Sequence, residues 1–252
     1  MERWQNKVAV VTGASAGIGE AISKDLLKAG LIVVGLARRK EKLEKIRESL
    51  PENLKLKFHM HKCDVGKEED VLSVFKWIDN ELGGTDILIN NAGCLKPCDL
   101  VALDNTEKVQ ETVNTNIMGV VYCTRSAYNS IRERKSNGHI ILINSVAGHI
   151  VPNIGTDLPS FNIYSPTKHA VTAMNEIYRQ EFKRYGLNCK VTSISPGAVD
   201  TDIFPEECAD MIKSTMPLLK SEDVSNAVLY VLGTPPHVQI HELIIKPMGE
   251  MC

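Results

Sequence analysis

The sequence has no strong excess of charge of either sign and no long apolar run. Its 252 residues carry a formal net charge of −2 at pH 7, which gives no electrostatic reason to expect nucleic acid or an anionic membrane as a partner. No segment reaches the roughly 18 apolar residues of a membrane-spanning helix. The first residues are polar and lead directly into an apolar strand-like segment, without the longer apolar stretch of a signal peptide.

Paired cysteine motifs are also missing. The seven cysteines are odd in number and include no C-x-x-C pair, which favours reduced thiols and a cytoplasmic location. Cys94 and Cys98 are spaced C-x-x-x-C, but no second pair of ligands stands near them in the sequence. His59 and His61 alternate along a strand-like segment without a carboxylate cluster, and we interpret them as structural. We therefore predict no metal site.

Apolar strand-like segments alternate with amphipathic helix-like segments along the chain. Strands are predicted at 7–12, 31–36, 55–62, 86–90, 139–144, 189–195 and 239–245. Helices are predicted near 18–29, 40–49, 67–82, 104–134, 163–185 and 221–232. The alternation predicts an α/β fold, namely a single Rossmann-like, doubly wound domain over 1–252 with a seven-stranded, mainly parallel sheet flanked by helices. Residues 198–220 break the alternation and are the candidate for a substrate lid.

A glycine-rich turn follows the first predicted strand directly. Glycine allows a sharp turn and a close approach to a ligand, and the next helix would point its unpaired N–H groups at a phosphate. The spacing G-x-x-x-G-x-G differs from the G-x-G-x-x-G of larger dinucleotide-binding domains. A turn that binds no nucleotide is the alternative. The predicted cofactor contacts in this turn are Gly13, Ser15, Ala16, Gly17, Ile18 and Gly19.

The second predicted strand ends without an acidic residue. NAD-binding domains place an aspartate or glutamate there for the ribose hydroxyls, whereas this chain continues with Arg38 and Arg39. Arginine offers a fixed fork of donors for a phosphate, so the sequence favours NADP over NAD. The alternative is that both arginines merely begin a solvated helix.

Polar or small residues also close the third and fourth predicted strands. Asp64, next to Val65, could accept a hydrogen bond from an adenine amino group or cap the following helix. The run Asn90-Asn91-Ala92-Gly93 could pack against the adenine ribose or brace adjacent strands. Asn116 lies inside a long predicted helix, where asparagine is a mediocre helix former and needs partners if buried. Helix bending or a structural water would also explain it.

Tyr164 and Lys168 stand four residues apart, and Ser145 lies nineteen residues before Tyr164. Positions i and i+4 share one face of a helix, so the ammonium can lie beside the phenol. A free phenol has a pKa of about 10, and a nearby positive charge lowers it. The pair therefore predicts a proton donor and acceptor near neutral pH. Pro166 lies between them and fits if the helix starts near Ile163, because proline is tolerated in a first turn.

Together with Pro196-Gly197-x-x-x-Thr201, these motifs resemble the short-chain dehydrogenase/reductase superfamily over nearly the whole chain. The resemblance implies a catalytic tetrad. Tyr164 would exchange a proton with the substrate oxygen, and Ser145 would hydrogen-bond that oxygen. Lys168 would hold the nicotinamide ribose and lower the tyrosine pKa, and Asn116 would anchor a water that relays protons to Lys168.

The resemblance extends to the cofactor, the substrate class and the assembly. It implies cofactor contacts from Pro196, Gly197, Val199 and Thr201, the last two at the carboxamide end. The opening Met1-Glu2-Arg3-Trp4 and the stretches HIILINSVAGH and TPPHVQIHELIIKP are similar to insect farnesol dehydrogenases and a related vertebrate cytosolic ketosteroid reductase. This implies an NADP-dependent oxidoreductase for an apolar alcohol or carbonyl of the farnesol type. A 3- or 17-ketosteroid or general carbonyl reductase is the alternative. A homodimer or homotetramer with the helices near 104–134 and 163–185 at the interface is also implied.

The expected substrate pocket is apolar, although ordinary core packing would explain the same residues. Its predicted walls are His149, Ile150, Val151, Pro152, Leu158, Phe161, Ile203, Phe204, Met211 and Met216. Two further hypotheses remain. One is a serine hydrolase, because residues 13–17 fit the G-x-S-x-G elbow; however, no earlier strand could supply an oxyanion hole, and the late His241 falls in a predicted strand. The other is a non-catalytic NADP-binding protein, which would have no need of a complete tetrad.

Overall fold

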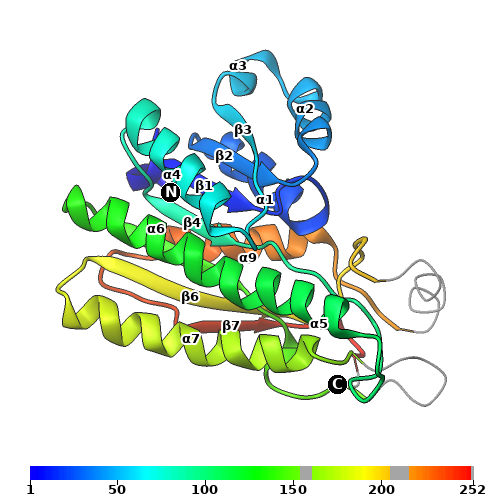
Figure 1. Cartoon of the computed structure of the whole chain (residues 1–252). Coiled ribbons are helices and arrows are strands. Elements are labelled where there is room, and N and C mark those ends of the chain that lie inside the picture. Colours follow the sequence, from blue (N-terminus) through cyan, green and yellow to red (C-terminus); the bar gives the residue numbers. More distant parts are fainter. Residues whose placement is uncertain (154–160, 205–215, 251–252) are drawn as a thin grey trace.

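A twisted parallel sheet forms the centre of the computed structural model, which describes residues 1–153, 161–204 and 216–250 (Figure 1). In these residues the seven strands follow the order β3-β2-β1-β4-β5-β6-β7, and every pairing is parallel. The predicted Rossmann-like α/β class is therefore confirmed. The strands are β1 (Val8–Thr12), β2 (Ile32–Ala37), β3 (Phe58–Lys62), β4 (Ile87–Asn90), β5 (Gly138–Ile143), β6 (Cys189–Pro196) and β7 (Glu242–Ile245).

Helices cover both faces of the sheet (Figure 1). Strand residues point alternately to the two faces, so Ala9 and Val11 join one buried cluster while Val8 and Val10 join the other. The first cluster includes α1, α2 and α9, and the second includes α4, α6 and α7. Burial on both faces explains why these strands are apolar without a polar alternation. The helices are α1 (Gly17–Lys28), α2 (Lys40–Ser49), α3 (Glu52–Lys55), α4 (Glu68–Leu82), α5 (Thr106–Val113), α6 (Gly119–Glu133), α7 (Tyr164–Arg184) and α9 (Ser221–Gly233), with the short turns η1 (Glu2–Trp4), η2 (Asn114–Met118) and η3 (Val146–Gly148).

The strand order reverses next to β1. From β1 the chain continues to β2 and β3 on one side and then returns to β4 on the other. Such a switch point leaves a crevice beyond the carboxyl ends of the two central strands, because the crossovers on either side lead away from each other.

Three predicted elements differ from the structure by more than one residue, whereas the ends of the others agree to within one. The third strand begins at Phe58, not at residue 55, because Glu52–Lys55 forms the short helix α3 after Pro51. The seventh strand begins at Glu242, so His241 precedes it. The long helix predicted at 104–134 is divided into α5 and α6 by the π-helical turn η2. Such turns occur frequently at functional sites, and this one contains Asn116.

The two described ends of the predicted lid at 198–220 are held together. Asp200 N donates to Leu219 O at 2.9 Å, and Leu219 N donates to Ala198 O at 2.8 Å. Residues 205–215, with the predicted pocket residue Met211, lie outside the described residues, as does Leu158. In the described part of the chain no helix is both long and apolar enough to cross a membrane.

Candidate active site

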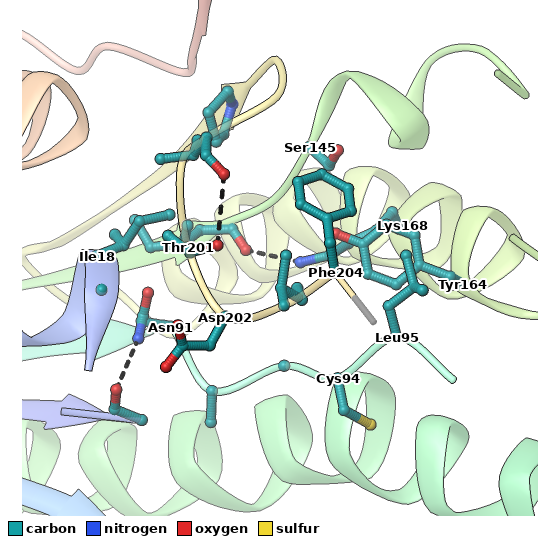
Figure 2. Close-up of a pocket in the computed structure, with 18 of the residues that line it drawn as sticks. Ile18, Asn91, Cys94, Leu95, Ser145, Tyr164, Lys168, Thr201, Asp202 and Phe204 are labelled. Carbon is teal, nitrogen blue, oxygen red and sulfur yellow. Dashed lines mark hydrogen bonds between the residues drawn. The ribbon is translucent and has the colours of Figure 1, made fainter. Parts of the chain in front are cut away.

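A cavity of about 760 Å³ opens at the switch point, at the carboxyl ends of the central strands. Its walls come from segments that follow β1, β2, β3, β4, β5 and β6, and from the first turns of α7. Figure 2 shows Ile18 and Asn91 toward one side of it and Ser145, Tyr164 and Lys168 toward the other. The cavity therefore has two ends with different linings.

The glycine turn forms the floor of the first end. Gly13 and Gly17 have left-handed backbones, with φ of +65° and +54°, and a Cβ on Gly13 would lie 2.9 Å from the Ala92 Cα. Helix α1 begins at Gly17 without a side-chain cap, so its first N–H groups are left for a ligand. These features fit the phosphates of a dinucleotide. Gly13, Ser15, Ala16, Gly17 and Ile18 line the cavity.

Arg38 and Arg39 follow β2 and also line the cavity. Arg39 is the N-cap residue of α2 but makes no capping hydrogen bond with its side chain. Arg38 extends to Glu111 of α5, where its Nη1 lies 3.2 Å from the carboxylate. Two guanidinium groups at this edge are suited to a phosphate on the adenosine ribose.

Asp64 and Val65, after β3, line the same end. Asp64 Oδ1 accepts a hydrogen bond from Gly66 N at 3.1 Å. The N-cap residue of α4 is Lys67, so Asp64 does not cap that helix as the alternative suggested.

Thr12, at the end of β1, is hydrogen-bonded to the residues that follow β4. Its hydroxyl accepts hydrogen bonds from the backbone N–H groups of Asn91 and Ala92, both at 2.9 Å. The Asn91 side chain donates in return to Thr12 O at 2.9 Å. Asn91 therefore braces the strands, and it also lines the cavity with Ala92 and Gly93.

Three predicted site residues lie behind the cavity wall. Gly19 packs against the glycine turn, where a Cβ would lie 2.3 Å from Gly13 O. Asn90 is buried and donates to Thr124 Oγ1 at 3.0 Å. Asn116 is also buried, and the cavity is not lined by any of the three. They support the wall and do not form its surface.

Ser145, Tyr164 and Lys168 meet at the second end of the cavity (Figure 2). Tyr164 is the first residue of α7 and Lys168 lies one turn later, so Pro166 falls in the first helical turn, as predicted. The Lys168 ammonium lies 5.6 Å from the centre of the Tyr164 ring and donates to Ile143 O at 2.9 Å. The Ser145 hydroxyl is hydrogen-bonded to the phenol of Tyr164.

Burial dominates the ionisation of this pair. It raises the pKa of Tyr164 to about 12, and the hydrogen bond from Ser145 offsets the increase only in part. Burial also lowers the pKa of Lys168 to about 8. The sequence predicted the opposite direction for the tyrosine pKa. That prediction was wrong for the protein alone, because the loss of water around the phenol outweighs the neighbouring charge.

Asn116 links the segment after β4 to the first turn of α7. Its Oδ1 accepts from Cys94 N at 2.9 Å, and its Nδ2 donates to Cys94 O at 3.0 Å and to Thr167 Oγ1 at 3.1 Å. Thr167 Oγ1 in turn donates to Tyr164 O at 2.6 Å. Asn116 thereby fixes the segment after β4 relative to the start of α7.

The segment after β6 closes the cavity between its two ends. Gly197 N donates to Ile245 O at 2.8 Å, and Ala198 N donates to Glu250 Oε1 at 3.2 Å. The predicted residues Pro196, Gly197, Val199 and Thr201 all line the cavity.

The second end is mainly apolar, with fewer of the predicted residues than expected. Pro152, Phe161, Ile203, Phe204 and Met216 line it, together with Leu95.

His149, Ile150 and Val151 do not line the cavity. Ile150 and Val151 stand between the lining residues Ala147 and Pro152 but are exposed to solvent. His149 Nε2 instead lies 2.9 Å from Glu242 Oε1.

Sequence reasoning missed several lining residues. Many are neighbours of predicted ones, and strand-end proximity could have identified them. Gly249 and Glu250 belong to no pattern and could not be found in this way. The missed residues are Leu36, Ala37, Cys63, Cys94, Leu95, Thr115, Ile143, Asn144, Val146, Ala147, Asn153, Ala198, Asp202, Pro217, Gly249 and Glu250.

A doubly wound parallel sheet with a glycine cradle and a Ser–Tyr–Lys group at its switch point defines a short-chain dehydrogenase. The chain matches the short chain dehydrogenase family over residues 7–211 and belongs to it. It is therefore an oxidoreductase of a family that binds a nicotinamide cofactor.

Individual relatives cover nearly all of the chain. It is 55% identical over 250 residues to a farnesol dehydrogenase of Aedes aegypti, covering 99% of each chain. It is 42% identical over 260 residues to dehydrogenase/reductase SDR family member 11 of Bos taurus, covering 100% of each. Among solved structures, the closed form of serine dehydrogenase complexed with NADP+ superposes with a TM-score of 0.82 and 30% identity, covering 94% of each chain.

Proposed function

We propose that this protein transfers a hydride between NADP(H) and an apolar alcohol or carbonyl of the farnesol and farnesal type. The observation that carries the proposal is the two-ended cavity. Arg38 and the glycine turn lie at one end, and Tyr164 with Ser145 and Lys168 lies at the apolar other end. The likeness to the Aedes aegypti farnesol dehydrogenase supports the same substrate class.

The cofactor, when bound, supplies or accepts the hydride. In the reducing direction Tyr164 donates its phenolic proton to the carbonyl oxygen, while the Ser145 hydroxyl hydrogen-bonds that oxygen and orients it. A hydride and a proton then convert the carbonyl into an alcohol. In the oxidising direction the phenolate takes the proton back. Lys168 places a positive charge beside the phenol, and Asn116 keeps α7 in position through Thr167.

The lining of the second end supports a neutral, apolar substrate. Leu95, Phe161 and Phe204 offer large apolar surfaces, and the charged lining residues near the segment after β6 are the acids Asp202 and Glu250. A substrate carboxylate would be disfavoured there, because like charges repel at close range. A ketosteroid satisfies the same conditions and remains the alternative substrate.

A substrate panel tests the proposal. The purified protein is assayed with farnesol, a simple alcohol and serine in the presence of NADP+ or NAD+, and with farnesal, 3- and 17-ketosteroids and a simple aldehyde in the presence of NADPH or NADH. We expect the highest kcat/KM for farnesol or farnesal with the phosphorylated cofactor. Preference for serine or for NAD(H) would contradict the proposal. Binding of NADPH without turnover of any substrate would favour the non-catalytic alternative.

The serine hydrolase alternative has no support in this geometry. His241 contacts Asn175 and Glu176 and does not line the cavity that holds Ser15. Inertness toward a serine-directed phosphonate would dismiss it.

We also propose a cytoplasmic homodimer or homotetramer with α5, α6 and α7 at the interface. Ile177 and Tyr185, on or just after α7, are large apolar residues exposed to solvent, which supports a contact there. Light scattering on the purified protein tests the assembly, and imaging of a tagged chain tests the location.

A further inference from the structure

An ion pair lies at the edge of the cofactor end of the cavity, where Arg38 is a lining residue and Glu111 stands behind it. Arg38, which follows β2, directs its Nη1 to Glu111 Oε1 of α5 at 3.2 Å. The two residues are 73 positions apart in the sequence, so the contact depends on the fold and not on local structure. Arg38 is one of the two arginines that the sequence assigns to a phosphate of NADP. It already has an anionic partner in the protein itself.

Glu111 has a second cation on its other oxygen. Lys96, from the segment after β4, pairs with Oε2. Lys96 first and Arg38 second hold the pKa of the Glu111 carboxyl below its usual range, so the group is charged at neutral pH. Glu111 can thus release Arg38 and still keep an ionic partner.

The pair bears directly on cofactor choice. A 2′-phosphate carries two negative charges near neutral pH, and it gains from Arg38 only to the extent that the guanidinium is not neutralised by a carboxylate. NAD has a hydroxyl at this position and leaves the ion pair intact. The carboxylate therefore penalises NADP binding without an equivalent effect on NAD.

We propose that Glu111 is a specificity-determining residue that moderates the preference for NADP by competing with its 2′-phosphate for Arg38. This inference rests on the proposed use of NADP and adds a residue that limits the preference for NADP over NAD. Since Glu111 keeps Lys96 when Arg38 is taken by phosphate, the competition costs little stability in either state.

The test is a double-mutant cycle in which cofactor dissociation constants are compared. Dissociation constants for NADP+, NAD+ and 2′,5′-ADP are measured by titration calorimetry on the wild type, Glu111→Gln, Arg38→Gln and the double variant. We expect Glu111→Gln to tighten NADP+ and 2′,5′-ADP by about two- to fivefold, the range for a partly exposed ion pair. NAD+ affinity stays within the error, and the gain disappears in the Arg38→Gln background.

Glu107→Gln is the matched control, since Glu107 is an exposed residue one turn earlier in α5 and its loss changes the net charge equally. A gain in that control, an equal gain for NAD+, or a gain that survives without Arg38 would overturn the inference. If the wild type binds neither NADP+ nor 2′,5′-ADP, the proposed function itself fails. A thermal melt of each variant confirms that it is folded.

Discussion

The two ends of the cavity are built in different ways. The cofactor end consists of backbone that has little freedom to vary, because Gly13 leaves no space for a Cβ and Thr12 holds the strand ends together. The substrate end is assembled from apolar side chains contributed by distant segments, such as Leu95, Phe161 and Phe204. The first end constrains which class of molecule binds, and the second can change its shape without changing the fold.

The largest effect should come from Tyr164, which stands with Ser145 and Lys168 at the second end of the cavity. Tyr164→Phe removes the only atom of that side chain that can carry the proton, so kcat should fall by at least about 10²-fold. NADPH affinity, measured by fluorescence titration, should stay nearly unchanged. Tyr185→Phe, an exposed tyrosine after the end of the same helix, is the control and should be as active as wild type. Appreciable turnover by Tyr164→Phe would separate the chemistry from this end of the cavity.

The rigidity of the cofactor end can be tested with two glycines of equal φ. Gly13 and Gly186 both have a φ of +65°, but a Cβ on Gly13 would meet the Ala92 Cα at 2.9 Å, whereas one on Gly186 meets nothing within 4 Å. Gly186→Ala should cost about 1–2 kcal/mol of unfolding free energy from backbone strain alone. Gly13→Ala should cost about 1–3 kcal/mol more and should also weaken NADP+ binding.

Urea unfolding measures the unfolding free energy of the two glycine variants, and titration calorimetry measures their NADP+ affinity. Equal losses of stability in the two variants, with NADP+ affinity preserved, would show that the turn tolerates a side chain and would remove the contrast between the two ends.

A change in the apolar lining of the substrate end should have a smaller effect, and it should alter the KM for the substrate only. Phe161→Ala removes a large apolar surface beside Tyr164, where the two rings stand edge to face at 6.2 Å. The KM for farnesol should rise about tenfold, since a lost apolar contact in a binding pocket is worth about 1–3 kcal/mol. The KM for NADP+, measured in the same preparation, serves as the internal control. A parallel rise in both constants would mean that the ends are not independent.

The smallest expected effect is on pH dependence. The pKa of Lys168 is lowered to about 8, so its charge is present below that pH and is lost above it, whereas Tyr164, with a pKa of about 12, keeps its proton throughout. The kcat/KM for carbonyl reduction should therefore be level below pH 7 and about half as large near pH 8.

Binding of 2′,5′-ADP to the cofactor end should not follow that decline, because Lys168 lies at the other end of the cavity. A reduction rate that stays level to pH 10 would show that the Lys168 charge is not needed.

Local patterns predicted residues at both ends of the cavity for a physical reason. Glycine spacing after a strand and a tyrosine four residues before a lysine depend on geometry within one turn, which the sequence displays directly. The first-turn position of Pro166 was deduced in the same way. The π-helical turn around Asn116 was missed, because residues 114–118 include no glycine or proline that would mark an interruption of the helix.

Long-range contacts escaped prediction for the opposite reason. Glu111 reaches Arg38 and Glu250 reaches Ala198 only after the chain has folded, and each is an ordinary glutamate in sequence. The direction of the Tyr164 pKa was also mistaken, because burial depends on the surroundings of a residue and not on its spacing from a lysine. Ile150 and Val151 were placed in the pocket by composition, although both are exposed to solvent.

The extra residue in the π-helical turn allows the fold to be kept while the activity is lost. Asn116 is hydrogen-bonded to Cys94 and to Thr167, and it lies in a π-helical turn that a regular α-helix would not contain. Loss of one residue there would let the backbone hydrogen bonds close into an ordinary α-helix. A descendant of this gene could in that way keep its architecture and discard its chemistry in a single step.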